Sequence, residues 1–385
     1  MSELTTPDLQ TAARIANRAL NNREYDDGAV VLESLPLALF VELTKNCNLH
    51  CPICRPKLAY DAAFNMPMEL FERVAAELFP TATLVDLRGW GESVLLRNFD
   101  RFIEIAASYR PQLRLVTNGQ INRPAIWDLL MAAHAIVVAS CDAASPELFA
   151  TLRAGGTMER FRSCVQSLVR SRDAHGAPRE NVVLTCVASP HNLQELSDVV
   201  ALAAALDVAK VILFPVQTNH EAGGPEQGET WSMAQHEREL AIAYERAIER
   251  GRTEGVIVQL GAAPTEGLAL PELVKPVPCM HPWSYAYLDH RGNVGFCDHL
   301  IGEPKHVFES VLDKSFAEIW NGPDFVQLRT AHRGGTLPDR FAECRWCYRQ
   351  RYVDFEERFH DKYATRRVAT DARRTLLAIS PTRPT

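Results

Sequence analysis

From residue 37 onward, short apolar runs typical of β-strands alternate with segments of helical period. The helical segments include residues 66–79, 98–109 and 193–206, in which apolar residues recur at i, i+3, i+4 and i+7. Six strands alternating with helices predict a parallel sheet with right-handed crossovers, either open and doubly wound or a partial barrel. In both, ligands bind at the carboxyl ends of the strands. The six strand-like runs are residues 37–43, 83–88, 112–117, 135–141, 182–189 and 210–215.

The pattern changes after the sixth run. A Gly-, Glu- and Pro-rich loop precedes a helix that Ser232 and Gln235 open as a capping box and Gly251 closes. Two β-type runs about a Gly-containing turn predict a hairpin at 285–297, and residues 315–330 read as a helix. The predicted plan is an N-terminal extension (1–36), a core (37–225), a helical linker (226–275), a small α+β domain (276–350) and a helical tail (351–385).

The composition is that of a folded chain of two or three domains. The 385 residues are 46% hydrophobic and 23% charged, with no compositional case for disorder. A net charge of −7 gives no long-range attraction to phosphate backbones, so nucleic acid is not an expected partner. The longest apolar stretch is interrupted by Asp207 and Lys210, and the N-terminus lacks a signal-peptide pattern. We therefore expect no membrane segment, no export and a cytoplasmic location.

Cysteines supply the first candidate chemistry. Cys47, Cys51 and Cys54 form a Cys-x3-Cys-x2-Cys loop directly after the first strand. Three thiolates can hold three irons of a cubane cluster and leave the fourth iron open to a substrate or cofactor. A zinc knuckle completed by His50 is the alternative, although structural zinc sites favour pairs of ligands on separate turns.

The segment VELTKNCNLHCPIC, placed after the first strand of a βα series, resembles the radical S-adenosylmethionine (SAM) superfamily. The resemblance extends over roughly residues 37–350 through several motifs in order. It implies a partial (β/α)6 TIM-like barrel, a SAM-binding [4Fe-4S] cluster on the cysteine loop, and S-adenosyl-L-methionine as cofactor. Bound at the open iron, SAM would be cleaved to a 5′-deoxyadenosyl radical that removes hydrogen from an unactivated carbon.

The resemblance also assigns cofactor contacts near the first two strands. Ile53 would lie beside the adenine, where the superfamily usually has an aromatic residue. Gly91 and Glu92, in the sequence RGWGESVLL, match the Gly-Gly-Glu turn that holds the methionine amino group, with Trp90 replacing the first glycine. Neither departure removes a ligand.

Further contacts follow the third and fourth strands. Asn118 lies in a Thr-Asn-Gly sequence that ends the third strand, and Ser140 and Asp142 end the fourth. The resemblance makes Ser140 and Arg153 contacts to the carboxylate and ribose of SAM.

Four more cysteines lie near the C-terminus. Cys279 and Cys297 flank the hairpin, and Cys344 and Cys347 form a Cys-x2-Cys. Spacing alone favours zinc over an iron–sulfur cube. After a radical SAM core, however, the pattern resembles the shortened SPASM domain called twitch, which carries one auxiliary [4Fe-4S] cluster. The spacing is similar to that of the aminocyclitol dehydrogenase of butirosin biosynthesis.

The remaining cysteines and nearby histidines have weaker signals. Cys141, Cys164 and Cys186 read as small buried hydrophobes, with Cys141 a weak candidate for a hydrogen-atom donor. The three histidines near the second cysteine set read as packing or surface residues; they are His281, His290 and His299.

The resemblance implies a radical SAM oxidoreductase. We expect oxidation of a small polar natural-product intermediate, such as an aminocyclitol, sugar or nucleoside of antibiotic biosynthesis, with a reducing partner such as flavodoxin or ferredoxin. Epimerisation or decarboxylation of such a substrate is an alternative. So is a ribosomal-peptide maturase, although the short N-terminal extension has no room for a leader-recognition module. A zinc-binding scaffold is the non-enzymatic alternative.

Overall fold

A single nine-stranded sheet organises the chain. The computed structural model describes residues 7–9, 11–54, 59–216, 231–233, 235–260, 279–297, 304–334, 337–341 and 344. All six expected strands are present, with β3 and β6 at the expected bounds. The strands are β1 Ala38–Val41, β2 Leu84–Asp86, β3 Gln112–Thr117, β4 Ile136–Ser140, β5 Val182–Ala188, β6 Lys210–Pro215, β7 Ile257–Leu260, β8 Tyr285–Leu288 and β9 Val294–Gly295.

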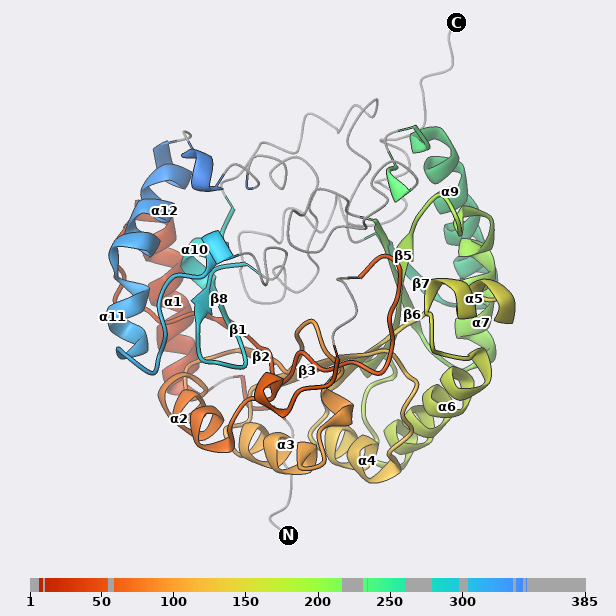
Figure 1. Cartoon of the computed structure of the whole chain (residues 1–385), viewed down its shortest axis with the longest axis horizontal. Helices are drawn as coiled ribbons and strands as arrows, with labels where there is room; N and C mark the ends of the chain where they lie inside the picture. Colours follow the sequence, from red (N-terminus) through yellow and green to blue (C-terminus); the bar gives the residue numbers. More distant parts are fainter. Residues whose placement is uncertain are drawn as a thin grey trace, which may run out of the picture.

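The strand order is β7-β6-β5-β4-β3-β2-β1-β8-β9, so each core strand neighbours the next one along the chain. Every pair is parallel except β8 with β9, which form the expected hairpin. A sequential parallel order is that of a barrel wall rather than of a doubly wound sheet. Figure 1 shows this arc, with strands inside and helices outside. The partial TIM-like barrel is confirmed, extended by β7 at one edge and the hairpin at the other.

Helices cover the outer face of the arc (Figure 1). In α2, for example, Leu70, Phe71, Val74 and Leu78 are all buried, as its amphipathic spacing predicts. The helices are α1 Ala12–Asp27, α2 Met68–Leu78, α3 Phe99–Ser108, α4 Pro124–Ala132, α5 Pro146–Leu152, α6 Met158–Ala174, α7 Leu196–Ala205, α9 Glu237–Glu254, α10 His281–Ser284, α11 Phe316–Trp320 and α12 Pro323–Gly334. Two short 3-10 turns near the site are η1 Ala62–Phe64 and η2 Ser93–Leu95.

Alternation along the strands separates two faces. Leu39 and Val41 of β1 join the main core between sheet and helices, whereas Ala38 and Phe40 belong to a smaller cluster on the inner face. The inner cluster also contains Tyr285 and Tyr287 of β8, so the hairpin contributes to the inside of the barrel wall.

The helix expected from Ser232 to Gly251 is placed differently. It runs from Glu237 to Glu254, and Gly255, whose φ is 73°, is the left-handed C-cap. Gly251 lies inside the helix, where a side chain would collide with the backbone of Val256 and the side chain of Val258. The segment expected to be a helical linker thus also contains β7, which pairs in parallel with β6.

The helix expected at 315–330 is two helices. Ser315 and Glu318 form a complete capping box at the start of α11. The break falls at Asn321 and Gly322, before Pro323 begins α12. The Asn321 side chain bonds there to the backbone N–H and carbonyl oxygen of Leu32. Within the described residues, no helix combines the length and apolar character needed to span a membrane. The expected tail at 351–385 lies outside the described residues.

Candidate active site

The cysteine loop rises from the carboxyl end of β1, on a closed polar base. The Asn46 amide donates to the Asp61 carbonyl oxygen (2.7 Å) and to Asn65 Oδ1 (2.8 Å), while Asn46 Oδ1 accepts from the Asp61 N–H (3.0 Å). Thr44 Oγ1 donates to the same Asn65 oxygen (2.6 Å). These bonds fix where the loop leaves and rejoins the sheet, which gives the following cysteines a defined starting point.

The three thiols of this loop are free of disulfides. Cys47 is exposed, whereas Cys51 and Cys54 are half-buried. Two N–H groups point at Cys47 Sγ, from the Leu49 backbone (3.5 Å) and the Asn118 side chain (3.7 Å). Burial raises the pKa of Cys51 to about 11, an effect that the Arg153 guanidinium opposes. Metal binding at Cys51 would therefore displace the proton of its thiol.

A tight turn packs against the base of the loop. The Glu92 N–H donates to the Asn46 carbonyl oxygen (2.8 Å). At Gly91 a Cβ would lie 2.6 Å from that same oxygen and would also collide with the Thr44 carbonyl, so only glycine fits. The residues expected to hold the methionine of SAM are thus in direct contact with the residues that precede Cys47.

The Glu92 carboxylate is almost fully buried and joins this turn to the end of β3. It accepts hydrogen bonds from the Asn118 N–H (2.6 Å), Thr117 Oγ1 (2.9 Å) and the Val94 N–H (3.3 Å). Burial raises its pKa to about 7, although these donors act in the opposite direction. The carboxylate therefore organises the chain around it before any ligand binds.

Arg153 and Asp142 form an ion pair where β4 ends. Arg153 Nε lies 2.6 Å from Asp142 Oδ2, and the Val187 N–H donates to Asp142 Oδ1 (2.8 Å). Burial lowers the pKa of Arg153, but the charges of Asp142 and of Cys51 raise it by more, so the guanidinium stays charged. The pair places a fixed cation beside the cysteine loop.

The other residues singled out from the sequence are buried or half-buried. Ser140 is buried at the end of β4, and Ile53 is half-buried against the main core. Cys141 is fully buried in that core, where its thiol donates to the Ala143 carbonyl oxygen (3.2 Å). Cys164 and Cys186 are buried as expected.

In the C-terminal cysteine set, Cys279 and Cys297 are half-buried and Cys344 is buried. Cys347 and His299 lie outside the described residues. His281 is buried, as is His290. Across the described ranges, no three His, Cys, Asp or Glu side chains are grouped closely enough to hold a metal ion as they stand.

The donor set of the first loop nevertheless fits an iron–sulfur cluster. Three disulfide-free thiols on one loop are the ligand type that such clusters use, and N–H donors to a ligand sulfur are a common means of tuning them. The loop is fixed at its base but carries Cys47 at its exposed start. This combination suits loading from solvent.

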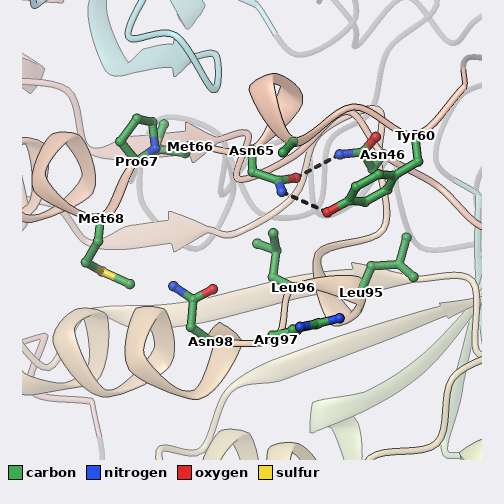
Figure 2. A pocket seen from close by; sticks show the side chains of 11 residues that line it. Asn46, Tyr60, Asn65, Met66, Pro67, Met68, Leu95, Leu96, Arg97 and Asn98 are labelled. Carbon is green, nitrogen blue, oxygen red and sulfur yellow. Dashed lines mark hydrogen bonds between the residues drawn. The ribbon is translucent and has the colours of Figure 1, made fainter.

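A cavity of about 730 Å³ opens beside the base of the loop. Figure 2 shows Asn65 bonded to both Asn46 and Tyr60 along one wall. Its opposite wall is formed by Leu95 to Asn98. None of the site residues expected from the sequence lines it.

Sequence reasoning missed Glu42, Asn48 and the role of His290. Asn48 accepts from the Asn118 side chain (2.9 Å), and the buried Glu42 carboxylate lies 3.2 Å from the His290 ring. The sequence held one signal for Glu42, because its carboxylate directly follows an apolar strand.

A parallel partial barrel whose first strand leads into a three-cysteine loop, with the Glu92 turn and the Arg153–Asp142 pair around it, defines a radical SAM enzyme. Its cofactors are S-adenosyl-L-methionine and [4Fe-4S] clusters. The C-terminal part is of the SPASM type, since residues 279–348 match the family described as "SPASM: Iron-sulfur cluster-binding domain".

The chain is similar to curated proteins over most of its length. The chain is 25% identical to the PqqA peptide cyclase of Xanthomonas euvesicatoria pv. vesicatoria (strain 85-10), covering 76% of this chain and 77% of the relative. It is likewise 25% identical to the PqqA peptide cyclase of Rhizobium meliloti (strain 1021), covering 83% and 81%.

Two structures solved with SAM share the fold. Streptococcus suis SuiB bound to S-adenosylmethionine superposes with a TM-score of 0.64 at 15% identity, over 80% of this chain and 71% of SuiB. The enzyme anSMEcpe with bound AdoMet superposes with a TM-score of 0.60 at 15% identity, over 90% and 98%.

Proposed function

We propose that this enzyme modifies a peptide through radical hydrogen abstraction. The observation that carries the proposal is the similarity to PqqA peptide cyclases over three quarters of the chain. SuiB was also solved with its precursor peptide SuiA, and anSMEcpe with a peptide. These comparisons favour the peptide-maturase alternative over the small polar metabolite that was the first expectation.

Residues of the cysteine loop would hold the first cluster. Bound there, SAM supplies a 5′-deoxyadenosyl radical that removes hydrogen from the substrate. Cys47, Cys51 and Cys54 would bind three irons, and the Leu49 and Asn118 N–H groups would remain bonded to Cys47 sulfur.

The surrounding polar groups would orient SAM. Glu92 is proposed to accept from its amino group, and Arg153, held by Asp142, to contact its carboxylate or ribose together with Ser140. Asn118 would support the loop, and Ile53 would pack beside the adenine. Because Glu92 is already bonded to Asn118, and Arg153 to Asp142, little reorganisation of these residues would accompany binding.

The inner face of the sheet is the proposed substrate surface. Phe40, Trp90, Tyr285 and Tyr287 pack together there, and the Arg88 guanidinium lies 4.8 Å from the Phe40 ring centroid. Arg88 Nε also lies 2.8 Å from the buried Asp86 carboxylate, and Arg114 Nε lies 3.7 Å from it. Two guanidinium groups near one carboxylate, beside aromatic rings, suit a peptide segment with apolar and acidic side chains.

We further propose a net oxidation in which the C-terminal domain accepts an electron. The ligands of an auxiliary cluster in this domain would be Cys279, Cys297, Cys344 and Cys347. A cluster closed by four cysteines has no open iron for a second SAM, which leaves electron transfer and shaping of the substrate site as its roles. Epimerisation and decarboxylation remain the competing reaction types.

The test compares two substrate classes. Anaerobically reconstituted enzyme, SAM and dithionite are incubated with synthetic peptides translated from short reading frames beside the gene, or with an aminocyclitol, sugar and nucleoside panel. Only the peptides should raise 5′-deoxyadenosine formation above the substrate-free rate. Mass spectrometry should then show that the stimulating peptide has lost hydrogen. Stimulation by a small metabolite alone would refute the proposal, and the Cys47→Ala, Cys51→Ala, Cys54→Ala variant is the blank.

A further inference from the structure

Two strands far apart in the sequence, β1 and β8, bring a carboxylate and an imidazole together at their carboxyl ends. Glu42 directly follows β1, and His290 lies in the hairpin turn after β8. Parallel pairing of Val41 with Leu288 aligns the two strand ends, and the Glu42 N–H donates to the Leu288 carbonyl oxygen (2.8 Å). Glu42 is 0% exposed and His290 is 1% exposed.

The two side chains contact each other directly. His290 Nδ1 lies 3.2 Å from Glu42 Oε2, so with a proton on Nδ1 the imidazole donates to the carboxylate. The Phe64 ring packs edge-on against the imidazole, with centroids 5.9 Å apart. His290 Nε2 finds no hydrogen-bond partner among the described residues. Glu42 is thus the polar anchor of this side chain in the described part of the chain.

The second oxygen of Glu42 holds the turn proposed to bind SAM. The Trp90 N–H donates to Glu42 Oε1 (2.9 Å). Gly89 lies so close that a Cβ there would be 2.6 Å from Glu42 Cβ. The turn then continues directly into Gly91 and Glu92.

The same pair also contacts the return of the cysteine loop. Phe64, whose ring covers His290, accepts a backbone hydrogen bond from Lys45 (2.9 Å), two residues before Cys47. One carboxylate–imidazole pair therefore touches the hairpin of the C-terminal domain, the Trp90–Glu92 turn and the cysteine loop.

We propose that Glu42 and His290 are positioning residues that couple the C-terminal hairpin to SAM binding. The carboxylate fixes the turn through Trp90, and His290 fixes the carboxylate, so the affinity for SAM depends on a residue of the C-terminal hairpin. This inference rests on the proposed assignment of the Trp90–Glu92 turn to SAM. Neither side chain needs to touch SAM itself.

The matched pair His290→Asn and His290→Leu tests the coupling. The two replacements have the same branched shape, and both remove the imidazole ring that packs against Phe64. Only asparagine keeps an N–H at the δ position, facing Glu42. We measure SAM binding by equilibrium dialysis on reconstituted enzyme, together with iron content and thermal unfolding.

We expect H290L to bind SAM about tenfold more weakly than wild type, within the range usual for coupling between sites, and H290N to stay within about threefold. Adding Glu42→Gln to H290L should recover part of the loss, because a neutral amide removes the buried charge left without its imidazole. The double variant also keeps the test available if H290L does not fold.

His306→Leu is the control for general destabilisation. His306 is another buried imidazole of this domain, and its Nε2 lies 2.9 Å from the Arg340 carbonyl oxygen, away from Glu42. H306L should lower thermal stability while keeping SAM affinity. Equal affinity of H290L and H290N, equal losses in H290L and H306L, or loss of iron in H290L would each overturn the coupling. Absence of SAM binding by the wild type would instead refute the proposed function, and the inference with it.

Discussion

Arg153 and Asp142 pair at 2.6 Å beside the cysteine loop, and Asp142 has no exposed surface. A buried carboxylate that loses its partner is strongly destabilising, whereas neutralising both partners is much less so. We expect Arg153→Gln to lower the free energy of unfolding of the cluster-free protein by about 3–5 kcal/mol. Adding Asp142→Asn should recover most of this loss in urea denaturation. A double variant no more stable than R153Q would show that the charge pair is not the cause.

The raised pKa of Glu92 predicts a pH dependence of stability. Burial raises it from 4.5 to about 7, so the unfolded chain ionises this carboxyl at lower pH than the native protein does. Stability from Glu92 is then fully present below about pH 4.5 and is lost as the pH rises to about 7.

Glu92→Gln should remove this loss of stability at rising pH. The unfolding free energy of E92Q relative to wild type should rise by about 3 kcal/mol between pH 4 and pH 8, as measured by urea titration at each pH. A constant difference across this range would contradict the raised pKa.

Gly91→Ala probes the contact between the turn and the loop base. Its Cβ would meet two carbonyl oxygens that belong to backbone and cannot rotate away. We expect a loss of about 1–3 kcal/mol in stability, together with weakened SAM binding. Gly334→Ala is the control, because nothing lies within 4 Å of a Cβ there. Equal behaviour of the two variants in calorimetry and SAM dialysis would argue against the close packing.

Iron content tests the division of the seven cysteines. Reconstituted wild type should approach roughly eight irons per chain, four for each cluster. The triple alanine variant of Cys47, Cys51 and Cys54 should keep roughly half and form no 5′-deoxyadenosine. The same variant with no iron at all, or a wild type with zinc in the second site, would refute two independent clusters.

Local pattern was enough to predict the core strands, because each is an apolar run bounded by breaks in period. The bounds of β3 and β6 agree with the prediction residue for residue. The strand β7 was not predicted, because the short run IVQL becomes a strand through its pairing with β6. The break between α11 and α12 was missed although Gly322 and Pro323 signal it.

Candidate site residues were found where a motif names them. Hydrogen bonds that no single motif contains join Asn118 to Glu92 and to Cys47, whereas their roles toward SAM and the cluster stay predictions. The Glu42–His290 contact could not be predicted, because it depends on β8 lying in parallel beside β1. Nothing in either local sequence specifies that register.

That same pairing sets an order for folding. Ala38 pairs with Tyr285, so the edge of β1 that pairs with β8 stays open on the ribosome until most of the chain has been synthesised. Contacts of such long sequence separation form slowly, and an open strand edge invites pairing with other chains. Slow translation or early truncation before the hairpin would therefore favour aggregation. The strand that supports the cysteine loop is among the last to be enclosed.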